Sequence, residues 1–394
     1  MSGVLDGVRV LDFGRFIAGG VCSLILAQMG ADVIRVESPG GDEDRHAGLL
    51  AGDGETFLIK VLSYCKRSIT LDMRSERGKA ILRQLVARSD VVVENFSPRG
   101  AEIMGLDYDT LRHANPSIIA VSINGFGSTG PYRDRLSFDP VAQAMSGGMA
   151  QNGFPGDPPG RCAIRYVDYS TGMSAACGAI AALYDRQRTG KGRRVEVALL
   201  ETALMMNGAS FAEVAGLGVD RPQSGNQAYH AAPGNLFAAQ DGWVYFVVVG
   251  NAAFKRFLKL VGHEELIGDA RFADDMARYE QRDLLEQLAN EWVAKRTVDQ
   301  AVAELTAARM PAGPVYTSAE VLGDPHILER QFFGELYFPG VGQLPVPSPH
   351  INLGDGRKVA FRSPWLASSN QEVYSELLNF DDATLAELRR DGII

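Results

Sequence analysis

Residues 8–37 read VRVLDFGRFIAGGVCSLILAQMGADVIRVE, and this stretch decides the fold class. The short apolar run Val8–Asp12 ends in a turn and predicts a strand. The small apolar residues Gly19–Met29 predict a helix, which Gly30 ends, and Ala31–Glu37 predicts the next strand. A strand, a helix and a strand in this order are typical of a parallel, doubly wound α/β sheet.

The same alternation continues toward the middle of the chain. Apolar residues at helical spacing predict further helices, and short apolar runs predict further strands. Residues 145–160 are rich in glycine and proline and predict a loop. The predicted elements are a helix over 77–88, strands over 90–94 and 117–123, a helix over 171–187, a strand over 194–198 and a helix over 199–209.

Length and composition predict more than one domain. The 394 residues, 46% of them hydrophobic, are enough for two or three domains. Glycine, proline, asparagine and glutamine concentrate near 215–235, and a strand over 242–249 and charged helices over 252–310 follow. Beyond Val321 we expect short helices and turns, and residues 369–390 are helical in pattern. The expected limits are 1–215 for a large domain, 225–320 for a small domain, and 321–394 for a linker and a return to the large domain.

The chain is acidic, with a formal net charge of -9 and a sequence pI of about 5.3. An acidic chain is a poor general binder of nucleic acid, because the phosphate backbone selects for lysine and arginine. A local basic cluster still allows contact with the phosphates of an anionic ligand, although a solvated charged face explains the same residues. The cluster consists of Lys66, Arg67, Arg74 and Lys79.

The sequence predicts neither an export signal nor a membrane span. The start of the chain lacks a basic segment followed by an apolar run, and no window approaches the roughly 18 apolar residues of a spanning helix. Cys22, Cys65, Cys162 and Cys177 show no C-x-x-C spacing, so we expect reduced and mostly buried thiols. We therefore expect a cytoplasmic protein without a membrane partner.

The loop Asp12–Gly20 lies between the first predicted strand and the first helix, where ligands bind in a doubly wound fold. Glu37 ends the second strand, as the ribose ligand of a dinucleotide enzyme would. The loop lacks G-x-G-x-x-G and a GK[ST] sequence, so a dinucleotide enzyme is only an alternative, and a tight turn explains the small residues. The six histidines show no metal-binding spacing, and no G-x-S-x-G is present, so neither a metal site nor a hydrolase triad is predicted.

The stretch Asp168-Tyr-Ser-Thr-Gly-Met173 precedes a predicted helix crowded with alanine and glycine. Aspartate, serine and threonine at a helix start are ordinary N-caps, which is one interpretation of Asp168. The other is a carboxylate that the positive end of the helix dipole keeps ionised, as a nucleophile requires. Composition and spacing alone predict no more than an α/β enzyme with an anionic ligand.

Several stretches taken together resemble the class III CoA-transferase family, which includes formyl-CoA transferase, carnitine CoA-transferase and α-methylacyl-CoA racemase. No single stretch is decisive, but in order and spacing they cover almost the whole chain, from Val4 to Ile394. The matching stretches are GVRVLDFGRFIAGG, GADVIRVESPGGD, KRSITLD, DVVVENFSPRGAEIMGL, GFGSTGPY, FDPVAQAMSGG, the helix after Asp168, TGKGRRVEVALLET, GWVYFVVVGN, RFADDMARYEQRDLL and MPAGPVYTSAEVLGDP.

The resemblance implies that Asp168 is the nucleophile of a CoA-transferase, which moves CoA from an acyl-CoA to a free carboxylic acid. The carboxylate attacks the thioester and forms a mixed anhydride, and the CoA thiolate then forms an aspartyl-CoA thioester. Donor and acceptor are both acids, so the enzyme needs neither a metal nor a permanently bound cofactor, and CoA is a substrate. Backbone N–H groups near Gly172, or in the loop His230–Gly234, are candidate donors to the developing oxyanions.

The racemase branch of the family is the main alternative. It moves the α-proton with a histidine and an aspartate, and its histidine matches Phe138, whose phenyl ring cannot take a proton. Asp139 resembles the transferase branch and is expected near the site, although a structural hydrogen bond also explains it. A CoA-binding protein without catalysis is the third hypothesis.

The resemblance also implies where CoA binds. Ser38 and Ile103 stand where some members carry basic residues, so Arg67, Arg99 or Arg135 is expected to share the phosphate contacts. The implied CoA contacts are Arg15, Phe16, Ala18, Leu71, Arg74, Asn95, Phe96, Met104 and Arg135.

The implied neighbours of Asp168 in the active site are Ile17, Phe138, Asp139, His230 and Gly234. Ile17 stands in place of a glutamine of the formyl-CoA transferase branch, and the loop that contains His230 lacks the glycine run of that branch. We therefore expect a larger, partly apolar acid rather than oxalate or formate. Mono- and dicarboxylates such as succinate both fit as donors, and the sequence does not choose between them.

Finally, the resemblance implies an architecture. A large Rossmann-like domain is built from both ends of the chain, and a smaller α+β domain is inserted through linkers near 215–235 and 318–340. Two such chains form a homodimer of interlocked rings.

Overall fold

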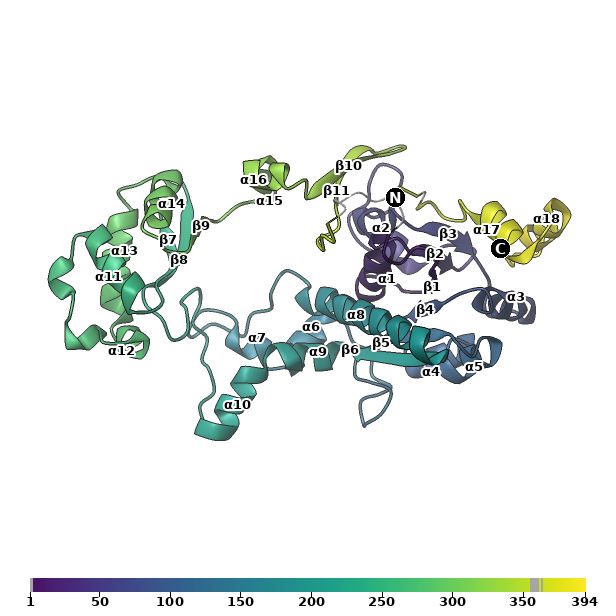
Figure 1. Ribbon diagram of the computed structural model, residues 1–394, viewed down its shortest axis with the longest axis horizontal. Helices are drawn as coiled ribbons and strands as arrows, with labels where there is room; N and C mark the ends of the chain where they lie inside the picture. Colours follow the sequence, from purple (N-terminus) through teal and green to yellow (C-terminus); the bar gives the residue numbers. More distant parts are fainter. Residues whose placement is uncertain (1–2, 355–360, 363) are drawn as a thin grey trace. The chain divides into compact units, whose positions relative to one another are not determined.

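Six parallel strands form the central sheet, in the order β3-β2-β1-β4-β5-β6. This is the strand order of a Rossmann sheet. Every residue of β4 is buried, as expected for a parallel strand that is covered on both faces. The strands are β1 (Arg9–Asp12), β2 (Asp32–Glu37), β3 (Arg67–Thr70), β4 (Val91–Glu94), β5 (Ile119–Asn124) and β6 (Arg193–Ala198) (Figure 1).

Helices bury both faces of this sheet, which confirms the predicted α/β class. One hydrophobic core contains residues of α1 and α8, which make extensive contact with each other, and the other contains residues of α3 and the C-terminal helices. The helices of the first core are α1 (Ala18–Gln28), α2 (Phe57–Ser63), α6 (Asp139–Met145), α8 (Tyr166–Thr189) and α9 (Leu199–Met206). Those of the second core are α3 (Glu76–Val86), α4 (Pro98–Met104), α5 (Tyr108–Ala114), α17 (Asn370–Leu378) and α18 (Asp382–Arg390).

The C-terminal helices return to the sheet that the N-terminal half builds. The Tyr374 hydroxyl donates a hydrogen bond to the Thr70 carbonyl oxygen at 2.7 Å, and the Asn370 side-chain oxygen accepts one from the Thr70 N–H at 2.9 Å. The pattern over 369–390 divides into two helices because Asn379 adopts a left-handed conformation between them.

The computed structural model describes residues 3–354, 361–362 and 364–394. The chain divides into two units, of which the first contains the parallel sheet and both ends of the chain (Figure 1). The domain limits that we expect from the sequence stay a prediction. The first unit consists of Met1–Gly148, Cys162–Gly218 and Leu328–Ile394, and the second of Met149–Arg161 and Val219–Ile327.

The second unit has a core of its own. A three-stranded antiparallel sheet packs its phenylalanines against amphipathic helices, as the charged pattern over 252–310 indicates. Its strands are β7 (Gly234–Ala238), β8 (Trp243–Val247) and β9 (Ala312–Pro314). Its main helices are α11 (Asn251–Val261), α12 (Asp275–Glu280), α13 (Arg282–Val293) and α14 (Val298–Ala307).

The sequence missed some elements. Beyond Val321 the expectation of only short helices and turns is wrong, because β10 (Phe333–Phe338) and β11 (Gly342–Pro347) form an antiparallel hairpin. The helix predicted over 199–209 ends at Met206, where Asn207 separates α9 from the next helix. The remaining helices are α7 (Gly148–Gln151), which lies within the predicted loop, α10 (Gly208–Leu217), α15 (Ser318–Gly323) and α16 (Pro325–Glu329).

Part of the predicted basic cluster is buried rather than solvated. Lys66 is 1% exposed, and its Nζ lies 2.9 Å from a carboxylate oxygen of Asp12. Arg67 is also buried, and its charge is already matched, which argues against Arg67 as a phosphate ligand. The carboxylates that pair with it are those of Asp32, Glu372 and Glu376.

The thiols are less buried than expected. Cys22 and Cys65 are buried, but Cys162 is half-buried and Cys177 is exposed on α8. No helix in the described part of the chain has the length and hydropathy that a membrane span requires.

Candidate active site

The loops after β1 and β4 meet where the strand order of the sheet reverses. Ligands of open α/β sheets bind in the crevice at this point. The Arg15 N–H donates to the Asn95 side-chain oxygen at 2.8 Å, and the Asn95 amide donates to the Arg15 carbonyl oxygen at 2.8 Å. The Arg15 guanidinium also lies 4.9 Å from the centroid of the Phe96 ring. Three of the expected CoA contacts therefore touch one another at this edge of the sheet.

A buried ion pair holds the first of these loops in place. Phe16 has a φ of 55°, in the left-handed region that residues with a side chain rarely adopt. Its N–H donates to the Asp44 carboxylate at 2.9 Å, and the Arg35 guanidinium donates to both oxygens of Asp44 at 2.8 and 3.0 Å. The strained conformation persists because these buried charges surround it.

Glu37 belongs to the same buried charge cluster. It is fully buried, and its carboxylate accepts hydrogen bonds from Arg45 and pairs with Arg35 at 3.2 Å. Burial by itself raises the pKa of a carboxyl group, but here the two guanidiniums prevail and lower the pKa of Glu37 to about 2. A carboxylate engaged in this way is unavailable to a ribose, which argues against the dinucleotide alternative.

A cavity of about 320 Å³ opens beside the same loop. Four of the expected CoA contacts line it, namely Arg15, Leu71, Arg74 and Met104, together with Ser38. The Arg74 side chain is exposed and makes no hydrogen bond or ion pair with any residue that the structure describes. Its guanidinium is therefore free to meet a phosphate group.

The other expected CoA contacts have different surroundings. Ala18 is buried at the start of α1. Arg135 is exposed and stacks on Tyr132, with its guanidinium carbon 3.9 Å from the ring centroid, and Arg99 is exposed on α4. The participation of Arg99 and Arg135 in CoA binding stays a prediction.

Asp168 lies in the first turn of α8, and Asp139 caps that helix. The helix begins at Tyr166 rather than Thr171, so Asp168 lies within it and not before it. One carboxylate oxygen of Asp139 accepts hydrogen bonds from the N–H groups of Val167 at 2.8 Å and Asp168 at 3.2 Å. The interpretation of Asp168 as the N-cap is therefore wrong, because Asp168 lies inside the helix and Asp139 accepts from two of the free N–H groups at its start.

Gln143 in turn holds Asp139. Its amide donates to the second carboxylate oxygen of Asp139, and its side-chain oxygen accepts from the Cys162 N–H at 2.9 Å. Asp139 and Gln143 are each 1% exposed. The sequence reasoning missed Gln143, although its spacing of four residues from Asp139 on one helix was the available signal.

Burial and a second carboxylate make Asp168 a weak acid. Asp168 is 7% exposed, and its burial and the charge of Asp139 raise the pKa of Asp168 to about 7, against the effect of Arg165. The expectation that the helix dipole keeps Asp168 fully ionised is wrong, because desolvation and like-charge repulsion outweigh the dipole. A carboxyl group with a pKa near neutrality is typical of catalytic sites.

The first turns of α1 and α8 come together because Gly172 lets the helices cross closely. A Cβ at Gly172 would lie 2.6 Å from the Ala18 carbonyl oxygen. Ile17, just before α1, and Val167, in the first turn of α8, belong to the same core. The N–H of Gly172 lies inside α8 and donates to the carbonyl oxygen four residues earlier, so it is not an oxyanion donor.

Apolar side chains lie close to the start of α8. Phe138 directly precedes the capping Asp139, is 58% exposed, and packs edge-to-face on Phe16 with ring centroids 5.6 Å apart. The buried carboxyl groups therefore lie next to an exposed aromatic surface.

His230 and Gly234 belong to the second unit. His230 lies in the loop before β7, has a φ of 76° and packs its ring on Tyr229, with centroids 3.8 Å apart. Gly234 is buried at the start of β7. The approach of these residues to Asp168 stays a prediction.

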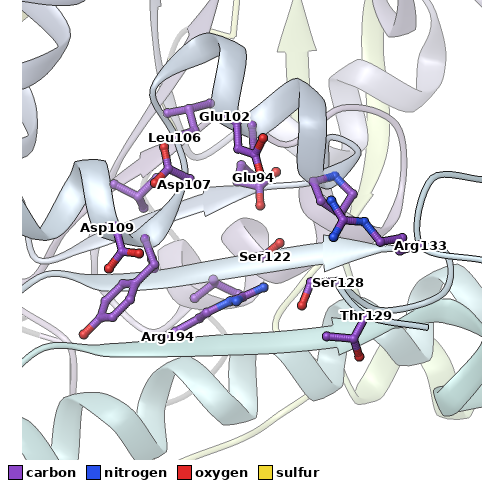
Figure 2. Close-up of a pocket in the computed structure, with 16 residues that line it drawn as sticks. Glu94, Glu102, Leu106, Asp107, Asp109, Ser122, Ser128, Thr129, Arg133 and Arg194 are labelled. Atoms are coloured by element: carbon purple, nitrogen blue, oxygen red, sulfur yellow. The ribbon is translucent and has the colours of Figure 1, made fainter. Parts of the chain in front are cut away.

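A second cavity, of about 350 Å³, lies between α4, α5 and strands β4 to β6, and no predicted site residue lines it. Figure 2 shows Glu94 and Ser122 on its strands, and Arg133 and Arg194 among its polar groups. Burial raises the pKa of Glu94 to about 7, although Ser122 and the Phe96 N–H donate hydrogen bonds to it. No sequence pattern indicated this cavity.

The fold and the site together define an α/β enzyme with a buried, near-neutral carboxyl group beside a ligand crevice. The model of CoA-transferase family III matches residues 5–368, and the chain belongs to that family. As the sequence predicts, the protein is a class III CoA-transferase.

Curated relatives and solved structures agree with this family. A succinyl-CoA–D-citramalate CoA-transferase of Chloroflexus aurantiacus is 37% identical, with 99% of this chain and 98% of the relative covered. A formyl-CoA:oxalate CoA-transferase of Streptomyces avermitilis is 34% identical, with both chains covered completely. The crystal structure of a CAIB/BAIF family protein from Brucella suis superposes with a TM-score of 0.83 at 34% identity, over 96% of this chain and all of that chain.

Asp168→Asn is expected to stabilise the protein at high pH. The pKa of Asp168 is about 7 in the folded state, against an ordinary value of 3.8, so the fold holds the proton more tightly. The stabilisation is present at low pH and is lost as the pH rises through 7, a loss that the amide avoids. Urea unfolding measures the effect. From pH 5 to pH 8, the free energy of unfolding of the variant should rise by about 2–3 kcal/mol relative to that of the wild type.

Asp185→Asn, near the C-terminal end of the same helix, is the control. Arg188 and Arg193 lower the pKa of Asp185, so its removal should have the same effect at both pH values. If pH changes the free energy of unfolding equally in the wild type and in Asp168→Asn, the raised pKa of Asp168 is contradicted.

Proposed function

We propose that the chain moves coenzyme A from an acyl-CoA to a free carboxylic acid, with the Asp168 carboxylate as nucleophile. The observation that carries this proposal is the placement of Asp168. It is a buried carboxyl group at the start of α8, with its N–H held by Asp139 and its pKa near neutrality. Its raised basicity favours attack on a carbonyl carbon.

In the proposed reaction, a carboxylate oxygen of Asp168 forms a bond to the thioester carbonyl carbon, and the C–S bond breaks. CoA leaves as a thiolate, which attacks the aspartyl carbonyl of the mixed anhydride and frees the first acid as a carboxylate. The acceptor carboxylate attacks the resulting aspartyl-CoA thioester and forms a second anhydride. The thiolate then takes the acyl group of the acceptor, and Asp168 is regenerated. Exclusion of water preserves the anhydrides, and burial of Asp168 supports this.

Succinyl-CoA is the proposed donor. The relative from Chloroflexus aurantiacus carries this donor in its name. The exposed ring of Phe138 offers apolar surface, which favours an acceptor larger than oxalate or formate. Since the sequence and the site call for no other group, CoA is the proposed ligand, with no permanently bound cofactor and no metal.

CoA is proposed to bind at the crevice between the loops after β1 and β4. Arg15, Phe16, Asn95 and Phe96 would line its path, and Arg74 would meet a phosphate group. The free guanidinium of Arg74 in the cavity beside Arg15 supports this placement.

A homodimer of interlocked chains in the cytoplasm is proposed as the working form. Apolar side chains that are exposed in one chain support a partner, since monomers rarely expose large apolar patches. On α9 and α10 these include Met205, Met206, Phe211 and Leu217. Sedimentation equilibrium should give twice the chain mass of 42.6 kDa, and a species of 42.6 kDa at micromolar concentration would contradict the dimer.

Asp168→Asn and Asp168→Ala are expected to abolish transfer. The assay is the incorporation of isotopically labelled succinate into succinyl-CoA, which needs no knowledge of the natural acceptor. Loss of the nucleophile should lower the rate by at least about 10³-fold. The wild-type rate should rise with pH and level off above about pH 7, as Asp168 loses its proton.

Asp185→Asn serves again as the matched control and should exchange label at the wild-type rate. Wild-type exchange by Asp168→Ala would refute the role of Asp168. If CoA binds tightly but no acyl-CoA exchanges label, the protein is a CoA-binding protein without catalysis.

Arg74→Ala is expected to weaken CoA binding about tenfold, because a charge-assisted hydrogen bond to phosphate is lost. Calorimetry with CoA measures the effect, and Arg83→Ala, an exposed arginine on the neighbouring helix α3, is the control. Unchanged affinity in Arg74→Ala would place the phosphates elsewhere.

A further inference from the structure

Arg165 stands immediately before α8, one helical turn ahead of Asp168. Arg165 precedes Asp168 by three residues, and its positive charge acts on the Asp168 carboxyl group, so the two side chains lie near each other. Arg165 is exposed, and its guanidinium makes no hydrogen bond or ion pair with any of the described residues. An unengaged cation therefore stands beside the carboxyl group proposed to react.

The carboxylates near Arg165 do not use it as a partner. Asp139 accepts its hydrogen bonds from the N–H groups of Val167 and Asp168 and from the amide of Gln143. Asp168 feels the charge of Arg165 but makes no ion pair with it. Among the groups described around the start of α8, Arg165 therefore keeps all of its donors for a ligand.

Exposed apolar side chains directly precede Arg165 and Asp139 in the sequence. Ile164 directly precedes it and is 70% exposed, and Phe138, next to the capping Asp139, is 58% exposed. A ligand that reaches Asp168 would thus meet apolar surface along its body and a guanidinium within reach of its end. A short apolar chain with a carboxylate at each end has this distribution of groups.

We propose that Arg165 binds the far carboxylate of a dicarboxylic substrate while the other carboxyl group, free or as its CoA thioester, meets Asp168. This proposal rests on the proposed function and names its substrate class. The guanidinium offers parallel N–H donors that match a carboxylate, which a methyl group at the same position cannot use. Three residues separate the two binding points, which is about 4.5 Å at the rise of roughly 1.5 Å per residue of a helix.

The test compares the binding of succinyl-CoA and butyryl-CoA, which differ in a terminal carboxylate and a methyl group. Calorimetry is carried out on the full chain with Asp168→Asn, so that no covalent chemistry intervenes. We expect succinyl-CoA to bind about tenfold more tightly than butyryl-CoA. When Arg165→Ala is added to Asp168→Asn, this preference should vanish because the affinity for succinyl-CoA alone falls. Arg165→Lys in the same background should restore part of the preference.

Arg188→Ala in the same background is the matched control, because it removes an exposed arginine from the other end of α8. Its preference for succinyl-CoA should be unchanged. A preference that survives Arg165→Ala, or an equal loss of both ligands, would overturn the role of Arg165. Failure of CoA itself to bind would instead overturn the proposed function and the inference with it, so the two failures are distinguishable.

Discussion

The candidate site depends on one interaction, the hydrogen bonds from the start of α8 to the carboxylate of Asp139. These bonds satisfy helix N–H groups that would otherwise be left without partners in a buried place. They also hold a second negative charge beside Asp168, which together with burial raises its pKa to about 7. The same contact thus stabilises the helix and makes the carboxyl group of Asp168 responsive near neutral pH.

The switch point of the sheet depends on a comparable arrangement of buried polar groups. Asn95 ties the loop after β4 to Arg15, and Asp44 holds Phe16 in its left-handed conformation. Since Gly172 brings α1 against α8, the loop proposed to carry CoA and the start of α8 belong to one continuous part of the first unit. Polar contacts within the protein hold both elements, and such preorganisation favours catalysis.

Local patterns sufficed to predict much of the fold, because β1, α1 and β2 each follow from the spacing of their own apolar residues. The start of α8 did not follow in this way, because its cap comes from Asp139, far away in the sequence. The sequence predicts an ionised Asp168, whereas burial raises the pKa of this group to about 7. The helix dipole is a local property that the sequence reveals, but burial depends on residues far away in the sequence. Arg67 was likewise expected to meet phosphates, yet helix α17 supplies carboxylates that neutralise it. Resemblance to a family supplied the site residues that no pattern reveals.

The most direct test of the central claim is intact-protein mass spectrometry after incubation with succinyl-CoA, with peptide mapping of the trapped product. An aspartyl-CoA thioester should appear on the peptide that contains Asp168, as an added mass equal to that of CoA less one water. Hydroxylamine should convert this adduct to a hydroxamate at the same residue. Two results would contradict Asp168 as the nucleophile. One is exchange of labelled succinate into succinyl-CoA without any adduct at Asp168, and the other is an adduct on a different carboxyl group.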